Sequence, residues 1–470
     1  MSTDLFPSNL KVVMFPWFAF GHINPFVQLS NKLSAHGVQV TFFSAPGNIA
    51  RIKNTLKLSP DINIVPLSIP HIDGLPPNID STADLTPSMS ELLKQALDLM
   101  QPQVKALLTE LKPHFVFFDF AQHWLPAMAS QLGIKTIAFS VFASSSNAYV
   151  MVPSRLKFRT NQKSCNISDL VKPPQGFPVT SINSLKAHEA KDLTYVFKNF
   201  HGNPSVYERV MDCLNNSNAM VMRTLDDEME RPYIDYISSQ FQKPVLSLGP
   251  LVSQSPPAGE LEEKWANWLG KFPPKSVIYC SFGSETFLNK DQIQELALGL
   301  ELTGSPFILV LNFPAHVDGP AELDKALPEG FLERVKDRGI GHIGWVQQQL
   351  ILAHEAVGCF VCHSGFSSVI EALVNDRQLV LLPFKNDQFF NSKWISGDMK
   401  AGVEVNRREE DGHFGQEDIM EAVSVVMSDK EASTFIRANH KKWRELLLNG
   451  HIQNKLIIDL VEQLKAMTSL

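Results

Sequence analysis

The stretch LKVVMFPWFAFGHINPFVQLSNKLSAHGVQVTFFS, residues Leu10–Ser44, decides the fold class of this chain. It begins with an apolar run of strand length and ends with another, VQVTFFS (Val38–Ser44). The segment from Ile23 to Ala35 between them has helical character, with Asn24 as the expected N-cap and Pro25 at the first helical position. A strand, a helix and a strand so close together form a βαβ unit, which predicts a parallel sheet.

The same alternation continues along the first half of the chain. HFVFFDF (His114–Phe120) and TIAFSVF (Thr136–Phe142) are strand-like runs with helical AMASQLG between them, and AMVMRT (Ala219–Thr224) closes the series. KPVLSLGPLVSQSPPAGE (Lys243–Glu260) then breaks the pattern, because it is rich in Pro, Ser and Gly and has no periodicity. Such a segment is typical of a linker between domains.

A second α/β series follows this linker. Its expected strands are SVIYCSFG, PFILVL, GHIGW, GCFVCH and LVLLPF. Its expected helices run from Lys290 to Thr303, near Gln348–His354 and near Ser368–Val374.

Two such series in 470 residues predict two domains, since this length is unusual for one. We expect an α/β protein with two Rossmann-like, doubly wound domains that face each other across a cleft. The expected boundaries are residues 1–242 for the first domain, 243–260 for the linker and 261–440 for the second domain. Ligands of such sheets bind beyond the carboxyl ends of the strands.

Composition excludes several classes of protein. The net charge is −7 and Lys and Arg form no long basic run, which argues against nucleic-acid binding. The cysteines are odd in number and scattered, so they favour a reducing compartment over a disulfide framework. The N-terminus lacks a signal-peptide pattern and no apolar run approaches about 18 residues, so we expect a soluble cytoplasmic protein. The five cysteines are Cys165, Cys213, Cys280, Cys359 and Cys362.

Cys359 and Cys362 have the spacing of half a zinc site. A structural zinc site needs further ligands, usually a second such pair, and the sequence contains none. Both cysteines also lie on a strand that is expected to be buried. We therefore expect core thiols and no metal.

The stretch WVQQQLILAHEAVGCFVCHSGFSSVIEALVNDRQLVLLPFKNDQ (Trp345–Gln388) carries the chemistry of a nucleotide-sugar site. An indole can stack on a planar base, and a carboxylate can accept both hydroxyls of a ribose. A Gly/Ser turn that enters a helix offers backbone N–H groups to a diphosphate. The terminal Asp-Gln pair can hold sugar hydroxyls.

This stretch resembles the signature box of the plant family-1 glycosyltransferases that use UDP-sugars. PWFAFGHINPFVQLSNKL, SVIYCSFGSETFL and the KKWRELL helix also resemble that family, so most of the chain is covered. The resemblance implies a GT-B fold, UDP-sugar as co-substrate without a cofactor or metal, and a C-terminal helix (441–470) that packs back on the first domain. We also expect a monomer. The segments WVQQQLIL, HSGF and AFGH resemble those of the branch that adds a second sugar to a flavonoid glycoside.

The resemblance assigns donor contacts residue by residue. Trp345 is expected to stack on uracil, with a buried structural Trp as the alternative. Glu371 is expected to accept the ribose hydroxyls, and a favourable charge near a helix N-terminus remains compatible with that role. Asp387 could otherwise be a solvated loop charge. The expected UDP-sugar contacts are Ser284, Trp345, Val346, Gln348, His363, Gly365, Phe366, Ser367, Ser368, Glu371, Asp387 and Gln388.

This chain departs from the family inside the box. Most members carry Cys-Gly-Trp-Asn between the His and the Ser, whereas this chain has Ser364-Gly365-Phe366-Ser367. The change removes polar groups near the sugar and the diphosphate. Glucose, xylose, rhamnose and galactose therefore all stay open as the donated sugar.

His22 and Asp119 are the expected catalytic pair. Each follows a strand of one parallel sheet, so both converge on the same sheet edge. Imidazole suits a general base near neutral pH, and a carboxylate behind it stabilises the imidazolium. The family gives the matching residues these roles. A structural loop histidine and a capping aspartate are the alternatives.

The first domain is expected to bind the acceptor. An aromatic, partly polar lining suits a flat phenolic glycoside, although core packing explains about half of these residues equally well. Saponin and terpenoid glycosides remain possible acceptors. The expected lining comprises Phe18, Phe20, Gln122, His123, Trp124, Phe142 and Tyr149.

Three rival functions fit these patterns less well. An α/β hydrolase needs a Gly-x-Ser-x-Gly elbow, and the segment Gly365–Val369 fails at its last position. A dinucleotide oxidoreductase needs Gly-x-Gly-x-x-Gly after the first strand, which is absent from the sequence. A non-catalytic UDP-sugar-binding protein is disfavoured by the presence of His22 and Asp119.

Overall fold

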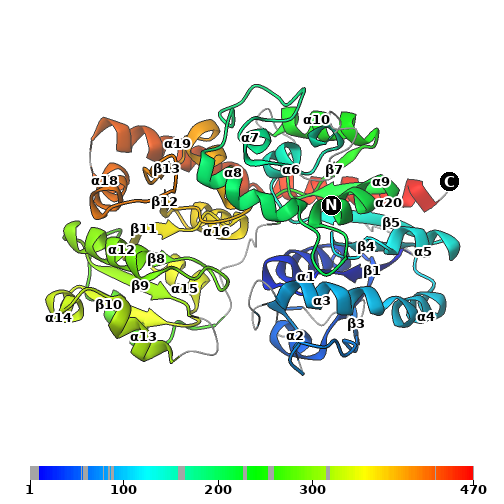
Figure 1. Cartoon of the computed structure of the whole chain (residues 1–470), viewed down its shortest axis with the longest axis horizontal. Coiled ribbons are helices and arrows are strands. Elements are labelled where there is room, and N and C mark those ends of the chain that lie inside the picture. The colour runs from blue at the N-terminus through cyan, green and yellow to red at the C-terminus, as the bar shows by residue number, and fades with distance from the viewer. Residues whose placement is uncertain are drawn as a thin grey trace, which may run out of the picture.

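Two parallel β-sheets, one in each half of the chain, organise the fold (Figure 1). The structure is a computed structural model that describes residues 10–53, 55–56, 62–77, 79–82, 85, 89–156, 165–225, 230–251, 259–313, 318–428 and 430–468. The strands are short apolar runs, and β4 (FVFF) and β11 (VGCFVC) are buried along their whole length. Continuous burial is expected for parallel strands that helices cover on both faces.

In the described part of the chain, the N-terminal sheet has seven strands in the order β3-β2-β1-β4-β5-β6-β7. Its paired strands run parallel, and β1 lies where the order reverses, between β2 and β4. The strands are β1 (Lys11–Phe15), β2 (Gln39–Ser44), β3 (Ile62–Pro66), β4 (Phe115–Phe118), β5 (Lys135–Ser140), β6 (Ala219–Met222) and β7 (Val245–Ser247).

The C-terminal sheet has the order β10-β9-β8-β11-β12-β13 within the described residues, again with parallel pairs. Its order reverses at β8, which lies between β9 and β11. The two sheets confirm the predicted α/β class with two doubly wound, Rossmann-like units. The strands are β8 (Val277–Ser281), β9 (Phe307–Leu311), β10 (Gly339–Ile343), β11 (Val357–Cys362), β12 (Gln378–Leu381) and β13 (Gly402–Glu404).

Helices surround both sheets (Figure 1). The first half contains α1 (Phe20–Ser34), α2 (Pro46–Ile52), α3 (Met89–Leu99), α4 (Gln101–Leu111), α5 (Leu125–Gln131), α6 (Ser144–Val150), η2 (Pro153–Arg155), α7 (Ile167–Leu170), α8 (Ala187–Leu193), η3 (Thr194–Phe197), α9 (Val206–Asn216) and α10 (Arg231–Phe241). The second half contains α11 (Glu263–Leu269), α12 (Lys290–Leu302), α13 (Gly319–Ala326), α14 (Phe331–Val335), α15 (Gln348–Ala353), α16 (Phe366–Val374), α17 (Gln388–Lys393), η4 (Trp394–Asp398), α18 (Gln416–Met427), α19 (Glu431–Leu447) and α20 (Gly450–Thr468).

Helix α1 begins three residues before the expected start at Ile23. The Ala19 carbonyl accepts hydrogen bonds from the backbone N–H groups of His22 and Ile23, both at 2.8 Å, and Ala19 is the N-cap. Asn24 is therefore not the cap, and Pro25 lies inside the helix. As a result, His22 lies in the first turn of α1. Helix α16 likewise begins before its expected start, at Phe366.

The segment predicted as the linker contains a strand. Val245 and Leu246 of β7 pair with Met220 and Val221 of β6, which extends the N-terminal sheet. A strand of three residues is too short to show alternation, so the pattern of the sequence hid it. Residues 252–258 of the same segment lie outside the described residues.

The two last helices pack on different halves. The imidazole of His440 and the indole N–H of Trp443, both on α19, bond to the backbone carbonyls of Arg377 and Met399 in the C-terminal half. Helix α20 instead buries Leu460 against the N-terminal sheet. The expected boundary at residue 441 therefore falls inside α19, and α20 alone returns to the first half (Figure 1).

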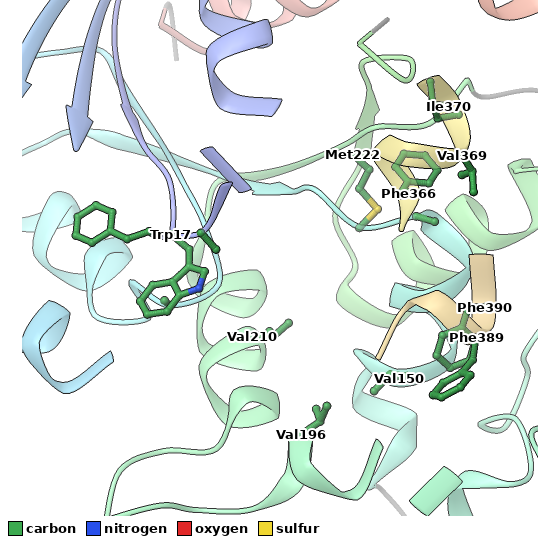
Figure 2. Close-up of a cluster of buried hydrophobic side chains, with 14 of the residues drawn as sticks. Trp17, Val150, Val196, Val210, Met222, Phe366, Val369, Ile370, Phe389 and Phe390 are labelled. Atoms are coloured by element: carbon green, nitrogen blue, oxygen red, sulfur yellow. The ribbon is translucent and has the colours of Figure 1, made fainter. Parts of the chain in front are cut away.

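An apolar core joins the two halves. Met222 at the end of β6 packs beside Phe366 and Ile370 of α16, while Phe390 of α17 approaches α6 (Figure 2). The ring centroids of Phe390 and Tyr149 are 4.9 Å apart. Because these side chains come from both sheets, burial of this core holds the halves together.

Candidate active site

The central residues of the predicted site follow two pairs of neighbouring strands, one pair in each sheet. In the N-terminal sheet the order reverses between β1 and β4, which are followed by His22 and Asp119 respectively. In the C-terminal sheet it reverses between β8 and β11, which are followed by Ser284 and His363. Doubly wound sheets bind their ligands at such switch points, because the loops there diverge to opposite faces.

His22 and Asp119 form a close contact. The Nδ1 atom of His22 lies 2.7 Å from Oδ2 of Asp119, and the two side chains are 13% and 2% exposed. The backbone N–H groups of Trp17 and Phe120 donate to the same carboxylate. When the imidazole is neutral and the carboxylate is ionised, Nδ1 is the donor of this contact and Nε2 is left as an acceptor. This is the arrangement of a base and the group that orients it.

Several carboxylates act on the protonation of His22. Burial by itself lowers its pKa, but the charges of Asp119, Glu285 and Asp387, with the Asp119 hydrogen bond, outweigh burial and raise the pKa above its ordinary value. Glu285 also accepts a 2.7 Å hydrogen bond from the Thr82 hydroxyl of the other half. The sequence reasoning missed Glu285, although it directly follows Ser284.

Aromatic rings flank the imidazole of His22. The ring centroids of Phe142 and Phe120 lie 5.2 and 5.5 Å from that of His22. Lys94, a buried ammonium on α3, lies 6.0 Å from the centroid of the Phe120 ring. Phe142 was predicted at the acceptor site, whereas Phe120 and Lys94 were missed. Phe120 directly follows Asp119, which was the available signal.

Three other predicted acceptor residues are part of the protein interior. The fully buried ring of Phe18 stacks on Trp17, and Trp124 packs against Phe15 at 6.4 Å between ring centroids. Gln122 is fully buried, and its amide donates to the backbone carbonyls of Phe15 and Pro16. Core packing, the alternative left open by the sequence, describes these residues.

The remaining predicted acceptor residues lie in three separate places. His123 contacts Asp212 and Asp98, with N–O distances of 3.3 and 3.7 Å. The Phe20 ring lies 5.3 Å from the Arg51 guanidinium. The buried hydroxyl of Tyr149 donates to the carbonyls of Leu170 and Val171 in the interior.

The imidazole of His363 is held between two glycines. A Cβ atom on Gly365 would clash with Nε2 at 2.5 Å, and one on Gly283 would lie in tight contact with Cε1 at 3.0 Å. Burial, reinforced by the charge of Lys385, lowers the pKa of His363 to about 4. The ring is therefore neutral near pH 7. Its Nδ1 atom is buried without a hydrogen-bond partner among the described residues.

Gln348, Ser368 and Glu371 come together beside this turn. The Gln348 amide donates to Oε2 of Glu371 at 2.9 Å and lies 3.4 Å from the Ser368 hydroxyl, while Gln349 donates to Oε1 of Glu371 at 3.0 Å. Burial raises the pKa of Glu371, and the two amides act in the opposite direction. The carboxylate is thus held in a fixed orientation by side chains of α15.

Trp345 and Val346 differ in their exposure. The Trp345 side chain is 81% exposed, so its indole is not part of the core. Val346 is buried, and its carbonyl accepts the backbone N–H of Gln348 at 2.8 Å. An exposed indole beside a buried anchor is a suitable stacking platform.

Asp387 and Gln388 are held at the start of α17. The Asp387 carboxylate accepts from the Asn391 amide at 2.9 Å, and burial raises the pKa of Asp387. The Gln388 side-chain oxygen accepts the backbone N–H groups of Phe384 and Lys385. The side-chain oxygen of Gln388 is therefore already hydrogen-bonded to the loop after β12.

Ser284 is exposed after β8, whereas Phe366 is buried in the core between the halves. The Ser367 hydroxyl accepts a hydrogen bond from Arg223 of the N-terminal half at 3.0 Å. The described residues contain no group of three or more His, Cys, Asp and Glu side chains that could hold a metal ion. No helix among them is long and apolar enough to cross a membrane.

Comparison with known proteins identifies the family of this chain. The family model described as "UDP-glucoronosyl and UDP-glucosyl transferase" matches residues 235–440. The chain is 59% identical to an anthocyanidin-3-O-glucoside rhamnosyltransferase of Petunia hybrida, over 99% of each chain. It is 41% identical to an anthocyanidin 3-O-glucoside 2''-O-glucosyltransferase of Ipomoea nil, over 95% of this chain and 96% of that protein.

The fold is also that of a solved plant protein. UGT73P12 of Glycyrrhiza uralensis, complexed with glycyrrhetinic acid 3-O-monoglucuronide, superposes with a TM-score of 0.78 at 24% identity, over 98% of this chain and 96% of that one. The architecture is therefore GT-B, as predicted. With two nearly full-length relatives far above 30% identity, the chain belongs to the plant family-1 UDP-sugar-dependent glycosyltransferases.

Proposed function

We propose that this glycosyltransferase transfers a sugar from a UDP-sugar to a sugar hydroxyl of a flavonoid or anthocyanin 3-O-glucoside. The donated sugar is xylose, rhamnose, glucose or galactose. The observation that carries the proposal is the His22–Asp119 contact beside Phe120 and Phe142. In this proposal residues 1–242 bind the acceptor and residues 261–440 bind the donor.

The reaction inverts the anomeric carbon. Nε2 of His22 removes the proton of the acceptor hydroxyl, while Asp119 stabilises the imidazolium that forms. The acceptor oxygen attacks the anomeric carbon from the face opposite UDP, and the bond from that carbon to the diphosphate oxygen breaks. The departing UDP is stabilised by the turn from His363 to Ser368 and by the N-terminus of α16.

The names of two relatives support the acceptor class. Both the Petunia and the Ipomoea proteins are described as acting on anthocyanidin 3-O-glucosides, one with rhamnose and one with glucose. The rings of Phe120 and Phe142 suit a flat phenolic acceptor, and the buried ammonium of Lys94, which pairs with Glu91, lies beside the Phe120 ring. An aglycone, or a saponin or terpenoid glycoside, is the alternative acceptor.

Release of UDP by purified protein tests the proposal. The donors are UDP-glucose, UDP-xylose, UDP-rhamnose and UDP-galactose, and the acceptors are a flavonoid aglycone, its 3-O-glucoside, an anthocyanin 3-O-glucoside and a saponin. We expect turnover with the two 3-O-glucosides and loss of turnover in His22→Ala. Turnover with the aglycone alone contradicts the acceptor class. UDP binding without turnover on any acceptor favours a non-catalytic binding protein.

The proposal also covers the cellular compartment, the oligomeric state and the metal requirement of the enzyme. The cysteines, which are all free and buried, are compatible with the reducing cytoplasm, where we place the protein as a monomer. We also propose that transfer needs no metal. Turnover after dialysis against EDTA and the sedimentation coefficient of the purified chain test the last two statements.

A further inference from the structure

Arg223 is a buried cation at the border between the two halves. It directly follows β6 of the N-terminal half and is 3% exposed. Its Nη1 donates to the Ser367 hydroxyl on α16 and its Nη2 donates to the carbonyl of Pro250, both at 3.0 Å. The guanidinium carbon lies 4.9 Å from the centroid of the Phe366 ring. One side chain of the N-terminal half thus contacts the first two residues of α16.

This placement is energetically costly. Burial lowers the pKa of Arg223 to about 10, against the opposing effect of Glu371, so the group remains charged near pH 7. Both oxygens that accept its hydrogen bonds are neutral, and its Nε is buried without a partner among the described residues. A desolvated charge with an unused donor destabilises a fold unless something compensates for it.

The neighbouring turn is the part of the proposed donor site where an anion is expected. The first backbone N–H groups of α16 have no partner within the helix, and they follow Gly365, the N-cap, which comes after His363 and Ser364. Rotation of the first turn of α16 would turn these N–H groups away from a diphosphate. The positions of Phe366 and Ser367 thus determine where the N–H groups point, and Arg223 contacts both residues.

We propose that Arg223 is a positioning residue of the donor site. It holds Phe366 through its aromatic face and Ser367 through a hydrogen bond, and so keeps the N-terminus of α16 aimed at the diphosphate of the UDP-sugar. Its buried charge further attracts that anion. The inference rests on the donor site of the proposed function. It adds that the N-terminal half completes this site, with a residue outside the matched range 235–440.

The test measures UDP binding by calorimetry in the full-length protein, and separately the KM values for donor and acceptor. UDP as the probe makes the test independent of the donated sugar and of the acceptor. We expect Arg223→Met to weaken UDP binding about tenfold or more, and to raise the KM of the donor but not that of the acceptor. Arg223→Lys keeps the charge but loses the planar fork, so we expect partial rescue.

Ser367→Ala removes one contact of Arg223 and leaves the buried charge in place. We expect UDP affinity to fall by roughly twofold to fivefold. Adding Ser367→Ala to Arg223→Met is expected to weaken UDP binding no further, because in this proposal Ser367 acts through its hydrogen bond to Arg223, which the first change has already removed. Independent, additive losses in this cycle contradict the proposed route through Ser367.

Arg155 supplies a matched control. Its guanidinium also lies over an aromatic ring, that of Tyr149 at 4.7 Å, and donates to the backbone carbonyls of Asp169 and Lys172, but all these partners are in the N-terminal half. We expect Arg155→Met to lower the Tm without a selective loss of UDP affinity. Equal loss of UDP affinity in both Arg variants, or none in Arg223→Met, overturns the inference.

The donor site itself is checked by Trp345→Ala. If this variant loses UDP affinity and Arg223→Met does not, the donor site is supported and the positioning role of Arg223 is contradicted. If UDP does not bind to the unaltered protein, the donor site and the role of Arg223 are both contradicted.

Discussion

The imidazole of His22 and the carboxylate of Asp119 meet at 2.7 Å although 97 positions separate them in the chain. They meet because β1 and β4 are neighbours in the N-terminal sheet, with Phe15 opposite Phe118 in the register. Each residue lies just beyond the carboxyl end of its strand. The contact is therefore a direct product of the doubly wound topology.

The protonation of His22 predicts a pH dependence for transfer. A general base works only when neutral, so activity falls on the acid side of the His22 pKa, which the surrounding carboxylates raise. Asp119→Asn removes a raising charge, so the acid limb of kcat/KM moves to lower pH. The pH profile from 5 to 9 measures this shift. An acid limb that stays in place contradicts the assignment.

Loss of the base itself has a larger effect. We expect His22→Ala to lower kcat by a factor on the order of 10²–10⁴ while UDP affinity is retained. The exposed His451 on α20 serves as the control, and its replacement by Ala leaves kcat unchanged. A residual rate in His22→Ala close to that of the unaltered enzyme would remove His22 from the mechanism.

Trp345 is predicted to contribute to binding and not to stability. Its side chain is 81% exposed, so Trp345→Ala changes the free energy of unfolding by less than about 0.5 kcal/mol. Loss of stacking weakens UDP binding by about 1–3 kcal/mol, and Trp345→Phe retains part of it. Calorimetry and thermal unfolding check the two statements. Unchanged UDP affinity in Trp345→Ala contradicts the stacking role.

Glu371 is predicted to accept hydrogen bonds from the ribose hydroxyls of UDP. Its carboxylate is held by Gln348 and Gln349, which leaves further acceptor capacity on both oxygens. We expect the unaltered protein to bind UDP more tightly than 2′-deoxy-UDP, and Glu371→Ala to abolish that preference, which amounts to about 1.5–3 kcal/mol. Equal weakening of both nucleotides by Glu371→Ala shows a structural role instead.

Helix α20 is predicted to stabilise the N-terminal half. Leu460 is 2% exposed and packs in the cluster that includes the N-terminal sheet. Leu460→Ala destabilises the protein by about 2–5 kcal/mol. Phe435 on α19 is 54% exposed, so Phe435→Ala is a control with a much smaller effect. Chemical denaturation compares the two, and similar losses contradict the packing assigned to α20.

Much of the fold was predictable because its signals are local. The sequence shows the apolar runs around β1, β4, β8 and β11 and the helical stretches between them. The two parallel sheets confirm the α/β class that these patterns predict. β7 was hidden because three residues show no period. The start of α1 was misplaced because the Ala19 carbonyl begins the helix where no side-chain cap marks it.

The amino-acid sequence by itself determined the chemical inventory of this protein: His22, Asp119, His363 and the box that ends in Gln388. His22, Asp119 and His363 could be found because they follow strands and the carboxyl ends of parallel strands share one edge. The other contacts in the box were implied by the resemblance to the family. Residues whose role depends on packing could not be found in this way.

Only the tertiary structure decided which side chains are buried and which are brought together. It placed Phe18 and Trp124 in the core, Phe120 beside His22, and Arg223 across the border on Ser367. Arg223 and Ser367 are 144 positions apart and belong to different halves of the chain, so no local pattern relates them. Such contacts depend on how two sheets pack against each other, which hydrophobic periodicity does not encode.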